Sequence, residues 1–199
     1  MNKKDIKKKG YYIECFDNGV WKYLDNKNVE HLIKWGKELC KGQYVWRYDN
    51  KDYAYLDNKG IEHLFRKGKE ICKGIMVRSF DNKDYKYEDN NGVEHLMRNG
   101  KEICKGKYVW SFDNRDYSYE DNKGIYHLIR KGKEICKGKY VWSYDNGDYE
   151  YTDNNGVEHL IRNGKELCKG KDVWRYDNGD YSYTDNKGIE HLTKGLENE

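Results

Sequence analysis

The histidines of this chain recur at a constant interval of 32 residues. They stand at His31, His63, His95, His127, His159 and His191. Five of the six cysteines keep the same interval, and the chain divides into copies spanning 10–41, 42–73, 74–105, 106–137, 138–169 and 170–199. A fixed period of this length is typical of repeat proteins, whose copies bury a core only together. We therefore expect one repeat domain over residues 10–199, preceded by a basic segment, residues 1–9.

Turn signals divide each copy into short segments. In the fifth copy, GKYVWSYDNGDYEYTDNNGVEHLIRNGKELCK, the Asn-Gly pair at 146–147 is typical of a two-residue type I′ hairpin. The Asp-Asn-Asn-Gly stretch at 153–156 suits a type I turn with a glycine bulge. The segments between turns have about four to six residues, which fits strands and is too short for helices. Each copy is therefore predicted to form a four-stranded antiparallel meander.

The turn lengths also predict a register. In the second copy, a two-residue turn at 50–51, a bulged second turn and a three-residue turn at 67–69 predict the pairs Tyr48–Tyr53, Trp46–Tyr55, Tyr55–His63, Arg66–Glu70 and Phe65–Ile71. This register places an aromatic ladder with the histidine on one face, and Val45, Leu64 and Cys72 on the other.

A sheet with apolar residues on both faces needs neighbours on both sides. The expected fold is therefore all-β, with six four-stranded copies most simply closed as a small six-bladed β-propeller. The alternative is an open stacked β-repeat array. Residues 3–6 resemble the strand that the last copy lacks, so they could complete the last blade. Equally, the unit could begin at that strand, which would suit the open array.

Charge and hydropathy narrow the classes of partner. The chain has 38 Lys and Arg against 35 Asp and Glu, and these alternate rather than cluster outside the basic segment. We therefore expect no nucleic-acid partner. No apolar run is long enough for a membrane span or a signal peptide, so the expectation is a cytoplasmic monomer without a membrane partner. Only 36% of residues are hydrophobic but 15% are aromatic, which predicts a core rich in Tyr and Trp.

The histidines and cysteines do not have the spacing of a metal site. Zinc sites use closely spaced ligand pairs, and His63 and Cys72 are predicted on opposite faces. We expect no metal, no cofactor and no catalytic residue, with each histidine partly buried and bonded to tyrosine or backbone. A metal-binding ring of histidines drawn from several copies is the alternative. The cysteines are expected to be buried, reduced and unpaired, because stacked sheets lie farther apart than a disulfide can reach.

Asp49 and Asp52 flank the first turn of the second copy, and the predicted register places them opposite each other. The same pair recurs in the next four copies. Facing carboxylates repel, and a shared Ca²⁺ ion would remove that conflict. The favoured interpretation is an Asx-turn in which the first Asp accepts a hydrogen bond from its own turn.

One tryptophan position provides the candidate binding residues. Glu14 and Arg78 occupy this position in the first and third copies, which argues against a place in the deep core. The other four copies carry tryptophan there, and these are the predicted ligand-binding residues: Trp46, Trp110, Trp142 and Trp174. Partly exposed indoles could stack on sugars or anchor a protein partner.

A short phrase in each copy resembles a known repeat class. VWKYLDNK at 20–27 and the YxYxDNxG stretches at 53–60, 85–92, 117–124, 149–156 and 181–188 are similar to the WG (KWG) class of bacterial β-repeats. The match rests on Trp21, Tyr23, Asp25 and their counterparts. The Gly that follows Trp in that class is missing here, as is its proline. The YDNG turns are also similar to variant MORN repeats, and either resemblance implies binding or scaffolding without catalytic residues.

The sequence thus favours a non-enzymatic protein-interaction scaffold. The alternative is a multivalent carbohydrate-binding module that uses the repeated Trp and Tyr side chains. The expected partner is a protein or a glycan.

Overall fold

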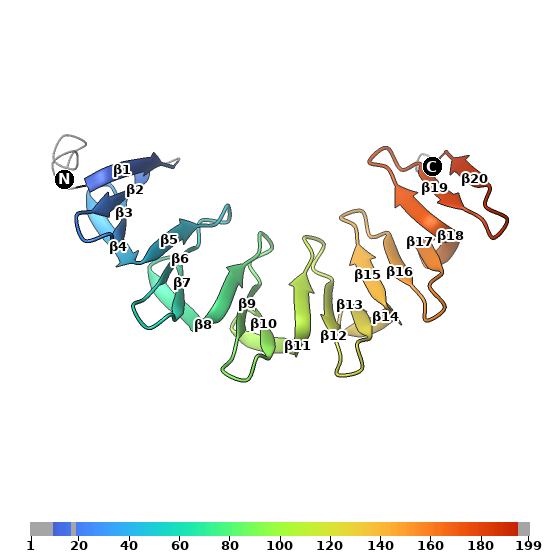
Figure 1. The fold of residues 1–199 in the computed structure, drawn as a ribbon, viewed down its shortest axis with the longest axis horizontal. Helices are drawn as coiled ribbons and strands as arrows, with labels where there is room; N and C mark the ends of the chain where they lie inside the picture. The colour runs from blue at the N-terminus through green and yellow to red at the C-terminus, as the bar shows by residue number, and fades with distance from the viewer. Residues whose placement is uncertain (1–9, 17–18, 195–199) are drawn as a thin grey trace. The chain divides into compact units, whose positions relative to one another are not determined.

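The structure is a computed structural model that describes residues 10–16 and 19–194. These residues form twenty short strands in three antiparallel sheets, β1–β4, β5–β14 and β15–β20, which confirms the all-β prediction (Figure 1). The chain divides into two compact units, residues 1–103 and 104–199, and the division falls inside one strand. In the part of the chain that the structure describes, no helix could cross a membrane.

The strands of the first unit follow one another in order, first as a sheet β1-β2-β3-β4 and then from β5 to β10. Their bounds are β1 (Gly10–Cys15), β2 (Val20–Asp25), β3 (Glu30–Lys34), β4 (Lys37–Gly42), β5 (Tyr44–Arg47), β6 (Tyr53–Leu56), β7 (Glu62–Arg66), β8 (Lys69–Ser79), β9 (Tyr85–Glu88) and β10 (Glu94–Arg98).

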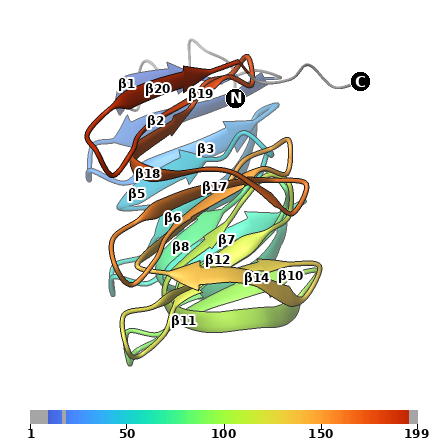
Figure 2. The ribbon, with the colours of Figure 1, turned by 90° about the vertical axis from the view of Figure 1, so that its right-hand side faces the viewer.

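In the second unit, β11 to β14 follow in order, and so do β15 to β20. Their bounds are β11 (Lys101–Ser111, which contains the division), β12 (Tyr117–Glu120), β13 (Tyr126–Arg130), β14 (Lys133–Gly138), β15 (Tyr140–Ser143), β16 (Tyr149–Thr152), β17 (Glu158–Arg162), β18 (Lys165–Arg175), β19 (Tyr181–Thr184) and β20 (Glu190–Thr193). The short turns between these strands are seen from the side in Figure 2.

The second and third copies share one continuous strand. The single strand β8 pairs with β7 through residues 69–74 and with β9 through residues 75–79. The register shifts between Ile75 and Arg78, and Met76 between them has φ 48°. This bulge bends the strand, as bulges do. The strand β18 passes from the fifth copy into the sixth in the same way.

The predicted register is correct at the second turn and wrong at the first. Tyr55 pairs with His63 as expected, but Trp46 pairs with Ala54 rather than with Tyr55. The backbone N–H of Tyr48 donates to the carbonyl of Asp52, so the first turn has three residues instead of two. Lys51, at φ 73°, takes the left-handed position of a type I turn with a bulge. One extra turn residue moves the tryptophan to the other face of the sheet.

The third turn, by contrast, is shorter than predicted. Lys67 and Gly68, at φ 51° and 79°, form a two-residue turn, and Arg66 pairs with Lys69. A bulge then restores the expected pair Leu64–Cys72.

Both faces of each four-stranded copy carry core residues, as predicted. On one face of the second copy, Leu64 and Ala54 are fully buried against Val77 and Tyr85 of the third copy. On the other face, Val45 and Tyr53 pack against Leu32 and Cys40 of the first copy. The leucine next to the histidine is 0% exposed in five copies: Leu32, Leu64, Leu96, Leu128 and Leu160. The core therefore lies between copies, so that one copy alone could not bury it.

Within the described residues, no strand pairing closes a sheet on itself. The closing strand predicted at residues 3–6, and the basic segment 1–9 that contains it, lie outside the described residues.

Candidate functional site

The repeated carboxylate next to the first turn belongs to an ion pair that sequence reasoning missed. Asp52 is 3% exposed, and the guanidinium of Arg66 donates to both of its oxygens. The hydroxyl of Ser79, from the third copy, donates to Oδ2 of Asp52 at 2.7 Å. The same Asp–Arg pair recurs in the next three copies as Asp84–Arg98, Asp116–Arg130 and Asp148–Arg162.

This geometry corrects the prediction of facing aspartates. Asp49 is exposed and Asp52 is buried, so the two do not share an ion. An Asx-turn does form, but its acceptor is Asn50 Oδ1, which takes the N–H of Asp52. The repeats contained a signal for this ion pair, because the first copy replaces both residues together. It has Val20 in place of the aspartate and Lys34 in place of the arginine.

Each of the first five histidines lies between two carboxylates, and among the described residues His191 of the sixth copy pairs with Asp185. In the second copy, Nδ1 of His63 lies 2.9 Å from Glu70 Oε2, and Nε2 lies 3.3 Å from Asp57 Oδ2. The imidazole stacks on the ring of Tyr55 at 4.7 Å. The predicted tyrosine contact is therefore a ring stack, and the hydrogen-bond partners are acids rather than backbone. The imidazole thus links Asp57 of the second turn with Glu70 on strand β8.

The second turn itself is ordered by Asp57. Its Oδ1 accepts the N–H groups of Lys59 and Ile61. The N–H of Ile61, followed by that of Lys59 and the imidazole of His63, holds the pKa of Asp57 below its usual range. Among the described residues, no three His, Cys, Asp or Glu side chains are placed to hold a metal ion.

The cysteines are free thiols, as predicted. His63 pairs with Lys73 and Leu64 with Cys72, so that the histidine and the cysteine lie on opposite faces of the sheet. Burial raises the pKa of Cys72 to about 12, and Cys40 and Cys136 behave in the same way.

The four predicted ligand-binding tryptophans differ in exposure. Trp46 and Trp110 are half-buried against the core clusters around Leu64 and Leu128. Trp142 is 39% exposed and Trp174 is 63% exposed. Trp142 makes an edge-to-face contact with Phe112, with ring centroids 5.2 Å apart.

A second exposed position was missed by sequence reasoning. Two residues before the tryptophan, successive copies expose a large side chain: Tyr44, Met76, Tyr108 and Tyr140. In the third and fourth copies this position lies at the bulge of the strand that joins neighbouring copies, and Met76 and Tyr108 have φ 48° and 47° there. Bulky side chains rarely adopt this conformation, and such outliers are found at functional sites. The sequence did contain a signal for this exposed position, because a Tyr or Met recurs there among polar residues.

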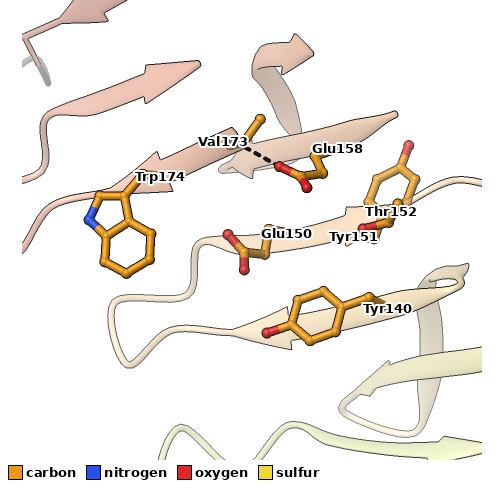
Figure 3. A pocket seen from close by; sticks show the side chains of 7 residues that line it. All are labelled: Tyr140, Glu150, Tyr151, Thr152, Glu158, Val173 and Trp174. Atoms are coloured by element: carbon orange, nitrogen blue, oxygen red, sulfur yellow. Dashed lines mark hydrogen bonds between the residues drawn. The ribbon is translucent and has the colours of Figure 1, made fainter. Parts of the chain in front are cut away.

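A cavity of about 130 Å³ lies in the second unit, between the fifth and sixth copies. Its lining residues are Tyr140, Glu150, Tyr151, Thr152, Glu158, Val173 and Trp174 (Figure 3). The cavity thus contains the most exposed of the predicted tryptophans and one residue of the second exposed position.

Two carboxylates lie in this cavity. Oε2 of Glu158 accepts the N–H of Val173 at 2.7 Å (Figure 3). Oε2 of Glu150 accepts the hydroxyl of Tyr144 at 2.7 Å. Burial, with a smaller contribution from the charge of Glu158, raises the pKa of Glu150. Burial and the charges of both glutamates raise the pKa of Tyr140 to about 12. The site therefore presents negative charge and an aromatic surface together.

No protein-family model matches this chain, and no curated protein matches it either. Among solved structures, the chain is similar to Hsv2 of Kluyvelomyces marxianus, with 13% identity, a TM-score of 0.44 and coverage of 91% of this chain and 74% of that one. It is also similar to the C-terminal WD40 domain of Sif2, with 12% identity, a TM-score of 0.43 and coverage of 90% and 71%. For BamB from Moraxella catarrhalis the identity is 10%, the TM-score 0.40 and the coverage 92% and 69%. At these identities and TM-scores, the likeness does not extend to a ligand or a partner.

Proposed function

We propose that this chain is a non-enzymatic scaffold that binds a protein partner through its exposed aromatic positions. One observation carries the proposal: the same two positions of successive copies leave large apolar side chains in solvent. In the second unit they are Tyr108, Tyr140, Trp142 and Trp174. Exposed apolar side chains that recur in register are typical of interaction surfaces.

The distribution of variation among the copies supports the same function. In the first five copies, the buried leucine and the histidine between its two carboxylates keep their identities, whereas the tryptophan position changes to Glu14 and Arg78. Variation at exposed positions on a constant frame produces a surface with a distinct chemistry in each copy.

We also propose that the six copies close into a small six-bladed propeller, with residues 3–6 completing the last copy. The apolar faces on both sides of each copy support closure, because a closed ring leaves neither end uncovered. Solution scattering tests the ring. A closed, compact chain should have a radius of gyration of about 16–17 Å, and a value above roughly 20 Å would establish the open array.

The alternative of carbohydrate binding rests on the two exposed indoles, Trp142 and Trp174. Sugars stack on such rings, and so do protein side chains. The acidic cavity beside Trp174 favours a charged partner over a neutral glycan.

Displayed libraries distinguish the two functions. The purified chain is screened against a random peptide library and against a glycan array, together with the variants Trp142→Ala, Trp174→Ala and Trp35→Ala. Trp35 is 80% exposed at the turn after β3 and is the matched control. We expect enriched peptides whose binding falls in the Trp142 and Trp174 variants and persists in the Trp35 variant. Glycan signals without peptide enrichment would make the lectin function correct, and no signal in either screen would overturn both.

A further inference from the structure

The cavity between the fifth and sixth copies carries a different charge from the equivalent place in two other copies, at the position of Glu150. Glu150 stands where the first and third copies have Lys22 and Lys86. The opposing residue, Glu158, has the counterparts Glu30 and Glu94 in those copies. The chain therefore allows a comparison of the same place with a lysine ammonium, in the first and third copies, and with a glutamate, in the fifth.

In the copies that have the lysine, its ammonium lies against the opposing glutamate. Lys22 Nζ lies 3.5 Å from Glu30 and donates to the carbonyl of Val45 at 3.1 Å. Lys86 Nζ lies 2.5 Å from Oε1 of Glu94. The Lys86 and Glu94 side chains are each 12% exposed, so the pair is largely removed from solvent. This place in the fold accommodates a primary ammonium twice within the same chain.

In the fifth copy, the ammonium is replaced by a second acid. Glu150 and Glu158 each use Oε2 in a bond within the protein, at Tyr144 and Val173, and each has a second oxygen to offer a ligand. Arg175 lies over the ring of Tyr144, and its guanidinium is bonded to Asp148. Its guanidinium is therefore bonded to a carboxylate outside the cavity, one that Arg162 also binds.

The aromatic walls of the cavity are suited to an ammonium group and to the methylene chain that carries it. Trp174 and Tyr140 present their rings on two sides of the carboxylates (Figure 3). An ammonium near an aromatic face gains a cation–π attraction. The volume of about 130 Å³ suits one side chain, since pockets for drug-sized ligands have about 300–1,000 Å³.

We propose that this cavity binds the side-chain ammonium of a lysine presented by the protein partner. The proposal rests on the scaffold function above and names the chemistry of one contact. Two carboxylates would accept from the ammonium, while Trp174 and Tyr140 enclose its methylene stem. The negative charge would also favour encounter with a basic segment of the partner.

The test uses Nα-acetyl-lysine N-methylamide, with the norleucine compound as the uncharged control. Binding to the full chain is followed by the indole N–H resonance of Trp174, which is assigned from its loss in Trp174→Phe. We expect a saturable shift with the lysine compound and none with the norleucine compound. Equal shifts with both compounds, or no shift with the lysine compound, would overturn the inference.

Three variants test the position of the site. Glu150→Gln keeps the shape and removes the charge, and binding should weaken at least about tenfold, as expected for a hydrogen bond to a charged group. Glu150→Lys should abolish binding, because the introduced ammonium would take the place that Lys22 and Lys86 take in their own copies. Glu190→Lys makes the same change at an exposed counterpart of Glu158 and should bind as the wild type does.

Two further outcomes separate the sources of failure. If 1,4-diaminobutane binds and the capped lysine does not, the site belongs to free amines and the lysine assignment is wrong. If the library yields peptides that bind Glu150→Lys as well as the wild type, the cavity inference fails while the scaffold function stands. If the library yields no enriched peptide at all, the scaffold function itself is contradicted.

Discussion

Arg66 holds Asp52 in a two-pronged ion pair across the first and third turns of the second copy. Nε lies 3.0 Å from both carboxylate oxygens and Nη2 lies 2.6 Å from Oδ2. The aspartate side chain is 4% exposed, and Ser79 of the next copy completes its hydrogen bonding. The pair therefore fixes the fold of one copy and its contact with the next.

Loss of the arginine should leave a buried, uncompensated charge. We expect Arg66→Met to lower the free energy of unfolding by about 3 kcal/mol, the low end for a buried pair, because the Arg66 side chain is 23% exposed. Urea denaturation measures this change. Lys59→Met, which removes an exposed cation from the same copy, should change the midpoint little. The double variant Asp52→Asn/Arg66→Met should recover part of the loss, and equal losses in the single and double variants would contradict the assignment.

Gly42 should not tolerate a side chain. A Cβ placed there would clash with the carbonyl oxygen of Leu56, where the end of β4 approaches the end of β6 closely. We expect Gly42→Ala to destabilise the first unit by about 3 kcal/mol, through the backbone shift that overpacking forces. Thermal unfolding followed by circular dichroism provides the measurement.

The matched control is Gly60→Asn. Gly60 has φ 78° with no atom within 4 Å of a Cβ, and the first copy has Asn28 at φ 59° in the equivalent place. Asparagine tolerates this conformation, so the change should cost less than about 1 kcal/mol. If both glycine variants unfold at the same temperature, the close approach at Gly42 is not what requires glycine.

Glu150 should destabilise the fold where it is ionised. Its folded pKa is raised by burial, so the stability that its protonated form provides is present below the unfolded pKa and lost as the pH rises through the folded value. Glu150→Gln keeps an acceptor for Tyr144 without the charge. We expect the variant to be more stable than the wild type at pH 7, with the difference disappearing near pH 4. Urea midpoints across this range measure it, and a difference that does not change with pH would contradict the prediction.

The buried thiols should resist alkylation in the folded chain. The pKa of about 12 at Cys40, Cys72 and Cys136 leaves almost no thiolate at neutral pH, whereas Cys15 is exposed. We expect iodoacetamide to label Cys15 first and those three only after unfolding in urea, as read by mass spectrometry of the peptides. Rapid labelling of Cys72 in the folded protein would contradict the packing around Leu64.

The sequence by itself determined the repeat, the strands and the placement of the histidine and the adjacent leucine on opposite faces of the sheet. The 32-residue period, the turn residues and the alternation of His63 with Leu64 are local properties, because they follow from the two-residue period of a strand. The second-turn pair Tyr55–His63 was predicted for the same reason. The length of the first turn was predicted wrongly, and its one additional residue pairs Trp46 with Ala54.

The tertiary structure alone decided which side chains meet across turns and between copies. Asp52 and Arg66 are separated by 14 residues, and Ser79 comes from the next copy, so their contact depends on how the sheets pack. The acidic cavity has the same origin, because Val173 and Trp174 reach Glu158 and Glu150 only when the sixth copy packs on the fifth. Strand periodicity acts over a few residues, whereas burial and charge pairing depend on packing between distant segments. Only the packed structure therefore showed which side chains of neighbouring repeats line a common cavity.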